Sequence, residues 1–169
     1  MLPMKLSWNS LKISIAGARL SHLVQKDKIW DHGSMTEQVK IVFYQVEKAR
    51  NKKDAGSLKK YLTQSGFEKL KWDIEAFEKI RSFFKNAVLT EISIIHVRPG
   101  KKEKPDRFRA LIKGKRKNSE DLIPVELNNY GIANFSEEWL FVRQGDWWLL
   151  EEIKPVRTIF SMRNKSIHY

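Results

Sequence analysis

The side chains that could carry out acid–base chemistry are few, and their positions do not bring two of them together. Those that could point into a core are Tyr44, Tyr61, Glu91 and His96. A carboxylate or an imidazole buried beside aromatic rings can acquire a pKa suited to general acid–base catalysis. Side chains alternate along a strand, so we expect His96 on the inward face and Glu91 on the opposite face. The sequence therefore predicts no catalytic pair and no catalytic residue.

The other acids and histidines also lack the spacing that chemistry requires. Two pairs of neighbouring acids occur in predicted strands, Glu137 with Glu138 and Glu151 with Glu152. Neighbours on a strand project to opposite faces, so neither pair can share a proton, and we expect all four at the rim of a sheet. No two histidines have the spacing of metal ligands, and the chain has no cysteine and no glycine-rich phosphate loop. We expect neither a metal nor a cofactor.

The chain is strongly basic, with 32 Lys and Arg residues against 20 Asp and Glu and a formal net charge of +12. Residues 98–117 contain ten of the basic residues and two acids. Such a surplus attracts nucleic acid or anionic lipid at low salt, and a merely solvated surface is the alternative. The residues expected to meet an anionic surface are Lys12, Arg19, Lys101, Lys102, Lys104, Lys115, Arg116 and Lys117.

Residues 1–29 form a predicted basic arm. Basic residues recur every seven positions in it, which is two helical turns, so they share one face of a helix, and apolar residues lie along another. The basic positions are Lys5, Lys12, Arg19 and Lys26, and the apolar ones are Trp8, Leu11, Ile15 and Ala18. This pattern is typical of an amphipathic surface helix or an organellar presequence, and an arm packed on its own domain is the alternative. No apolar run is long enough to predict a membrane span.

The elements that follow the arm predict an α+β fold. Apolar residues at helical spacing predict a helix over residues 35–49, a short helix near 58–62 capped by Asp54, and a third helix over 65–84. The third is apolar over more than half its circumference, so we expect it to be central. After Asn86 the period changes to two, which predicts strands over 88–97 and 107–112, joined by an exposed basic loop at 99–105. Phe108, Ala110 and Ile112 should face inward.

The strongest hairpin signal is the aromatic segment around Gly145 and Asp146. A two-residue turn there would pair Val142 with Leu149 and Phe141 with Leu150. One face would then hold Trp139, Phe141, Trp148 and Leu150, and the other Leu140, Val142, Trp147, Leu149 and Ile153. Because both faces are apolar, we expect a partner, the tail or a ligand to cover the second. The predicted hydrophobic groove or partner surface comprises Trp72, Phe77, Trp139, Phe141, Trp147, Trp148 and Leu150.

Three segments together resemble the Tim-forty-four-like domain, the C-terminal domain of the mitochondrial inner-membrane import-motor anchor and its bacterial relatives. They are residues 39–54, residues 58–63 with Phe67 and Leu70, and residues 139–153 with Gly145 in the turn. The match covers residues 30–155. The resemblance implies a cone-like α+β domain of the nuclear-transport-factor-two-like superfamily, in which helices pack in a curved antiparallel sheet. It also implies a hydrophobic groove, membrane-surface association, and protein or ribosome partners.

The function we expect is a non-enzymatic binding or assembly module. Its partner would be a protein or a second copy, with peripheral contact to an anionic membrane surface, as in protein translocation or membrane-complex scaffolding. The alternatives are a ribosomal-RNA-associated basic protein and a small-molecule-binding, isomerase or dehydratase-type member of the superfamily. We expect a basic arm at residues 1–29, the α+β domain at 30–156 and a basic tail at 157–169. The expected location is cytoplasmic or at the inner face of a membrane, with an organellar matrix as the alternative.

Overall fold

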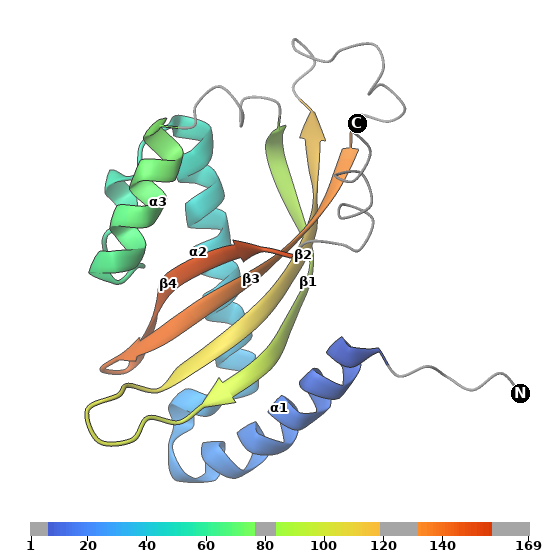
Figure 1. The fold of residues 1–169 in the computed structure, drawn as a ribbon, viewed down its shortest axis with the longest axis vertical. Helices are drawn as coiled ribbons and strands as arrows, with labels where there is room; N and C mark the ends of the chain where they lie inside the picture. The colour runs from blue at the N-terminus through green and yellow to red at the C-terminus, as the bar shows by residue number, and fades with distance from the viewer. Residues whose placement is uncertain (1–6, 77–83, 119–131, 157–169) are drawn as a thin grey trace, which may run out of the picture.

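A computed structural model describes residues 7–76, 84–118 and 132–156 as helices followed by an antiparallel sheet (Figure 1). The helices are α1 (Trp8–Lys26), α2 (His32–Lys52) and α3 (Gln64–Ala76), with the 3-10 turns η1 (Lys28–Trp30) and η2 (Gly56–Leu58). The strands are β1 (Phe84–Arg98), β2 (Arg107–Asn118), β3 (Ile132–Gln144) and β4 (Trp147–Pro155). The strands pair in the order β1-β2-β3-β4 as a meander. The predicted α+β fold is confirmed.

Short polar side chains fix where the helices begin. The amide of Ser34 donates to Oδ2 of Asp31 at 2.9 Å, which satisfies one free amide of the first turn of α2. The helix ends at Lys52, and the following residue, Lys53, caps it in a left-handed conformation with φ of 56°. Asp54 accepts a hydrogen bond from the amide of Gly56 at 2.9 Å, but the N-cap of η2 is Ala55, which makes no side-chain capping hydrogen bond. The short helix predicted near residues 58–62 with Asp54 as its cap is therefore wrong, since only the single turn η2 forms and it ends at Leu58.

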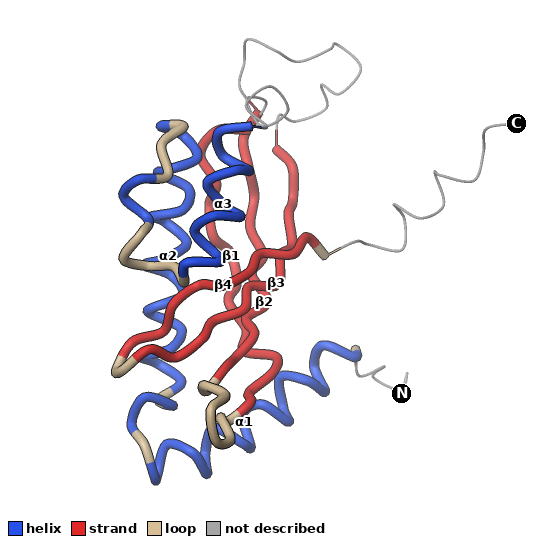
Figure 2. The backbone as a smooth tube through the Cα atoms, turned by 60° about the vertical axis from the view of Figure 1, so that its left-hand side comes forward, coloured by secondary structure: helices blue, strands red, loops and turns tan. Residues whose placement is uncertain are grey.

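The core lies between α2 and the inner face of the sheet. The inward stripe of α2 is fully buried and consists of Met35, Val39, Val42, Phe43 and Val46. Across from it, the rings of Phe108 and Phe141 stack at 5.0 Å, and Trp148 meets Phe108 edge-on at 4.8 Å. The central helix is therefore α2, which runs behind the sheet in Figure 1 and to its left in Figure 2. The expectation of a central third helix is wrong.

The third helix packs one side on β4. Its Leu70 and Ile74 are buried, but Trp72 on another side is 60% exposed. A Cβ on Gly66 would lie 2.6 Å from the carbonyl oxygen of Leu150, so the absence of a side chain lets the helix approach the strand. The preceding segment pairs with β4 as well, since the amide of Leu150 donates to the carbonyl of Tyr61 at 2.9 Å. This segment and α3 thus cover part of the β4 edge.

Bulges change the side-chain alternation in β1 and β4. The β3–β4 hairpin has the predicted register, with Phe141 opposite Leu150 and Val142 opposite Leu149 around a turn in which Gly145 has φ of 62°. A register shift then places Ile153 opposite Trp139. Ile153 consequently packs against the core cluster and not on the outer face as expected. In β1 similar shifts occur between Leu89 and Glu91 and between Ile94 and His96.

Candidate anionic-surface site

The outer face of the sheet carries rows of charged side chains that bridge three strands. Arg107 on β2 lies 3.9 Å from Glu151 on β4, and Arg109 lies 4.0 Å from Glu152. Both pairs reach across β3, where Val142 is the neighbour of Arg107 and Leu140 is the neighbour of Arg109. The charged groups meet at the surface while their aliphatic stems lie over the apolar residues beneath them.

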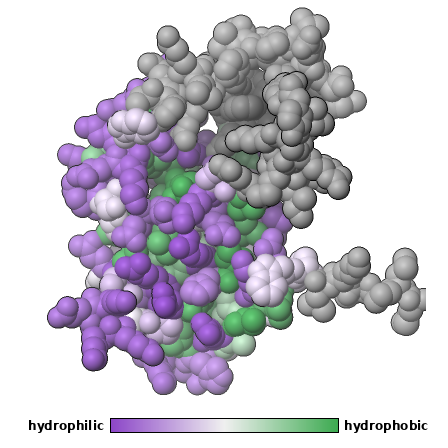
Figure 3. Space-filling model, in the orientation of Figure 1, coloured by the Kyte–Doolittle hydropathy of each residue, from purple (hydrophilic) through white to green (hydrophobic). Residues whose placement is uncertain are grey.

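These side chains explain how the second apolar face of the hairpin is covered. Val142 and Leu140 are only 8% and 9% exposed. A partner, the tail or a ligand had been expected as the cover, and the tail lies outside the described residues; at these two positions the side chains of the neighbouring strands lie beside the apolar residues. Farther along the face Leu149 is half-buried and Trp147 is 38% exposed. Figure 3 shows this face as polar side chains with apolar areas between them.

The aromatic residues predicted to form a groove divide between core and surface. Trp139, Phe141, Trp148 and Leu150 are buried in the core. They are therefore not available for contact at the surface of this fold. Trp72 on α3 and Trp147 at the β3–β4 turn are exposed, whereas Phe77 lies outside the described residues.

His96 faces outward, contrary to the expectation of an inward histidine. The register shift between Ile94 and His96 brings His96 opposite Arg109, on the outer face. Partial burial lowers the pKa of His96 below its ordinary value of 6.5, and nearby positive charges lower it further. Those charges, in decreasing order of effect, belong to Arg19, Arg109, Arg98 and Lys12. The bulge thus assembles cations from one helix and two strands around a histidine.

The other proposed acid–base residues do not form an inward set. Tyr44 is 45% exposed and Tyr61 is half-buried. Glu91 faces outward as expected and lies 3.8 Å from Lys113. Glu137, expected at the rim, is instead buried and accepts a hydrogen bond from Nε1 of Trp139 at 2.8 Å. Its role in this contact is to satisfy a buried indole donor.

One side of α1 is fixed to the rest of the molecule while another is exposed. Ala16 and Leu20 are buried in the core cluster, and Nη1 of Arg19 donates to the carbonyl of Val97 on β1 at 3.2 Å. The exposed side carries an apolar stripe of Trp8, Leu11 and Ile15, which are 69%, 41% and 50% exposed. Nζ of Lys12 lies 5.8 Å from the centre of the Trp8 ring. We call these three apolar residues the α1 stripe.

The predicted anion-binding residues fall into two groups. Lys101, Lys102 and Lys104 are exposed in the β1–β2 loop, at the same end of the sheet as α1 in Figures 1 and 2. Lys115 is eight residues along β2 from Arg107, which places it about 26 Å away at about 3.3 Å per residue. Arg116 and Lys117 are the next residues of that strand, and their side chains are not described. Lys12, Arg19 and the loop lysines are therefore the members that the fold brings to one end.

Arg143, whose role was not predicted from the sequence, joins three segments at this end of the sheet. Its Nη1 donates to Oδ2 of Asp27 at 2.5 Å and to Oδ2 of Asp106 at 3.1 Å, and its Nε donates to the carbonyl of Gly145 at 2.7 Å. These contacts join the α1–η1 junction, the β1–β2 loop and the β3–β4 turn. An open depression of about 470 Å³ beside Arg143 is lined partly by Lys102 and Lys104. The one sequence feature that could have indicated this role is the position of Arg143 at the start of a tight turn.

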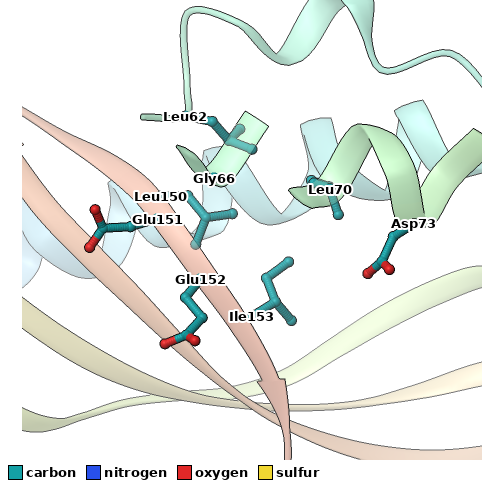
Figure 4. Close-up of a pocket in the computed structure, with 8 residues that line it drawn as sticks. All are labelled: Leu62, Gly66, Leu70, Asp73, Leu150, Glu151, Glu152 and Ile153. Atoms are coloured by element: carbon teal, nitrogen blue, oxygen red, sulfur yellow. The ribbon is translucent and has the colours of Figure 1, made fainter. Parts of the chain in front are cut away.

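The small, partly open pocket between α3 and β4 has too little room for an organic ligand. Figure 4 shows it beside Leu62, Gly66 and Leu70, with Leu150 and Ile153 on the strand. Its volume is about 30 Å³, enough for a water molecule but far below the roughly 300 Å³ of small-molecule pockets. Within the described ranges, no three acids or histidines are grouped as metal ligands. In the same ranges no helix has both the length and the apolar content to cross a bilayer.

Comparison with known proteins gives a distant relationship of fold. No protein-family model matches the chain, and no curated protein matches it. A similar solved structure is that of the intermembrane space region of the chloroplast protein ARC6, with a TM-score of 0.48 and 12% sequence identity. The similarity covers 72% of this chain and 96% of that chain. At this level the comparison bears on the fold alone.

Proposed function

We propose that this chain is a non-enzymatic binding and assembly module that docks on an anionic membrane surface through α1. The observation that supports the proposal is the arrangement of α1. Its α1 stripe of Trp8, Leu11 and Ile15 is exposed next to Lys12 and Arg19, while its other side is fixed to β1. The resemblance to the Tim-forty-four-like domain is consistent with this proposal and supplies the finer expectation of a protein partner on the same membrane.

The α1 stripe has the chemistry of an interfacial helix. Tryptophan prefers the headgroup level, and Leu and Ile beside it can enter the boundary with the acyl chains. Lysine and arginine on the same side lie at the depth of the lipid phosphates, where each contributes about 1 kcal/mol on an anionic membrane. The loop residues Lys101, Lys102 and Lys104 lie at the same end of the sheet and add to the attraction. An α1 lying flat on the membrane would use all of these groups together.

The same cations could contact the phosphates of RNA, but the apolar residues favour lipid. Phosphate contacts need charge alone, and bases stack on aromatic or guanidinium planes. Leu11 and Ile15 have neither a charge nor a planar group with which to contact RNA, yet both are exposed to solvent in this chain. A bilayer surface would bury them.

The test is sedimentation with vesicles of phosphatidylglycerol and phosphatidylcholine, compared with vesicles of phosphatidylcholine alone. Trp8→Ser removes the largest exposed ring and is expected to weaken binding to anionic vesicles about tenfold. Lys12→Gln removes one charge and is expected to weaken it about fivefold at low salt. The matched controls are Trp72→Ser, an exposed tryptophan on α3, and Lys40→Gln, an exposed lysine on α2. Both controls should bind as the parent does.

Two results would contradict the proposal. One is equal binding to anionic and neutral vesicles, or none to either. The other is a loss of binding on Trp72→Ser with no change on Trp8→Ser, which would move the contact to α3. Tight, salt-sensitive binding to structured RNA together with no vesicle binding would favour the RNA-associated alternative in its place.

A further inference from the structure

The outer face of the sheet next to α1 concentrates positive charge around one histidine. We define the His96 cluster as His96 with Arg19, Arg98, Arg109 and Lys12. His96 and Arg109 are cross-strand partners, so their Cβ atoms are about 5 Å apart. Arg98 is two residues along β1 on the same face and pairs with Arg107. Arg19 is held at this place by its hydrogen bond to Val97, the residue between His96 and Arg98.

This arrangement has an energetic cost that the fold does not fully offset. Like charges directly opposite one another on neighbouring strands are destabilising, and Arg98 faces Arg107 in this way. Arg107 and Arg109 are partly balanced by Glu151 and Glu152 on the far side of β3. Over the described residues, no acid lies within ion-pair distance of Arg98, Arg19 or Lys12. Among the described residues, the side of the cluster toward α1 is thus cationic without a neighbouring acid.

We propose that the His96 cluster binds the phosphate group of an anionic lipid, and that it binds more tightly when His96 is protonated. This inference rests on the proposed membrane function, because α1 provides both the stripe and two cations of the cluster. With the α1 stripe in the interface, Lys12 and Arg19 would lie at the headgroup level. Guanidinium groups of Arg98 and Arg109 offer paired donors that match phosphate oxygens. The phosphate would offset part of the positive charge that surrounds the imidazole.

The pH dependence follows from the charges that face His96. From α1 these are Arg19 and Lys12, from β1 Arg98, and from β2 Arg109, and all of them disfavour the imidazolium. A bound anion opposes their effect and therefore raises the pKa of His96. By linkage, whatever raises that pKa must bind the protonated form more tightly, by about tenfold for each unit. Affinity should consequently rise as the pH falls below 6.5.

The experiment follows the imidazole signal of His96 by NMR across pH in sulfate and in chloride at matched ionic strength. Sulfate is the soluble probe because its charge does not change in this range. We expect sulfate to move the titration midpoint of His96 upward, saturably, and to bind more tightly at pH values below that midpoint than at values above it. His96→Gln assigns the signal.

The variant that removes the site is Arg98→Gln with Arg109→Gln, and near-ultraviolet circular dichroism checks its fold. Arg98→Gln alone keeps the stem of Arg109 over Leu140 and serves where the double variant fails to fold. Either variant should abolish or reduce the sulfate-dependent shift. On phosphatidylglycerol vesicles it should weaken binding more below pH 6.5 than above it, whereas Trp8→Ser weakens binding at both.

The outcomes separate the site from the proposed function. No midpoint shift with sulfate overturns the site, and vesicle binding that still depends on Trp8 would then leave the membrane function standing. A sulfate shift with vesicle binding unchanged in the Arg98→Gln variants overturns the lipid as the source of the phosphate. A sulfate shift in a protein that binds no vesicles overturns the lipid source and the proposed function together.

Discussion

Arg143 shows how much one side chain can hold together in this fold. Its guanidinium contacts Asp27, Asp106 and the carbonyl of Gly145, which belong to three separate segments. Hydrogen bonding by Arg143 lowers the pKa of Asp27 below its ordinary 3.8, and the aspartates raise the pKa of Arg143. Because the folded pKa of Asp27 is depressed, its contribution to stability is present above pH 3.8 and is lost as the pH falls through the lower folded value.

Arg143→Lys keeps the charge but loses the planar set of donors. We expect the free energy of unfolding at neutral pH to fall by about 1 to 2 kcal/mol, a range reduced because Asp27 is partly exposed. The difference from the parent should shrink below pH 3.8, as Asp27 becomes protonated. Urea unfolding as a function of pH measures both the loss of stability at neutral pH and its decrease at low pH. Arg107→Lys, at a long and exposed ion pair, is the control and should change stability by less than about 0.5 kcal/mol.

At the residue scale the sequence predicted burial better than orientation. The inward positions Phe108, Ala110 and Ile112 are confirmed because a run without bulges keeps strict alternation. His96 and Ile153 were assigned to the wrong faces. A bulge inserts one residue into a strand and so reverses the alternation beyond it, and no residue type in the sequence indicates where a bulge occurs. The contacts of Arg143 with Asp27 and Asp106 could not be predicted, because these acids lie 116 and 37 residues away from it in the sequence.

At the scale of elements, the hairpin turn could be predicted from the sequence, while the cap of the short helix and the packing of the helices could not. Gly145 and Asp146 fix the hairpin register locally, so the pairing of Val142 with Leu149 followed from sequence. The exposure of Trp72 did not follow from the sequence, because an apolar side of a helix is buried only if another element packs against it. The close contact of α3 with β4 depends on Gly66, whose role appears only once the two are placed together.

The glycines of two helices should respond in opposite ways to alanine. Gly66→Ala puts a Cβ 2.6 Å from a backbone oxygen of β4, and we expect it to destabilise the protein by about 1 to 3 kcal/mol despite better helix propensity. Gly17→Ala, in α1, meets nothing within 4 Å and is expected to stabilise by up to about 1 kcal/mol. Thermal unfolding of both variants is the measurement. Equal effects would show that α3 does not approach β4 in this way.

For the whole molecule, the arrangement covers part of each edge of an open four-stranded sheet. At one edge, the segment before α3 pairs with β4. At the other, α1 lies along β1 and Arg19 binds its backbone. Unpaired edges invite pairing between chains, so these two covers favour a discrete fold. The same helix that covers β1 carries the proposed membrane surface, and its attachment therefore matters to both roles.

Weakening the attachment of α1 should loosen the β1 edge selectively. Leu20→Ala removes a buried contact of α1 and is expected to cost about 2 to 4 kcal/mol. Hydrogen exchange should increase in α1 and near Val97 on β1, with much smaller changes in the β3–β4 hairpin. Ile15→Ala, on the exposed side of the same helix, is the control and should change neither stability nor exchange. Uniform loss of protection over the sheet would argue against a separable α1.

The division of the tryptophans between interior and surface gives this protein two kinds of natural fluorophore. Trp30, Trp139 and Trp148 are sealed in the interior, and Trp8, Trp72 and Trp147 are open to solvent. The inner three should emit at shorter wavelength and resist aqueous quenchers, so they report on unfolding. The outer three lie on α1, α3 and the β3–β4 turn, so a change in emission on binding that is lost when one of them is replaced by Phe identifies the contacting element without any added label.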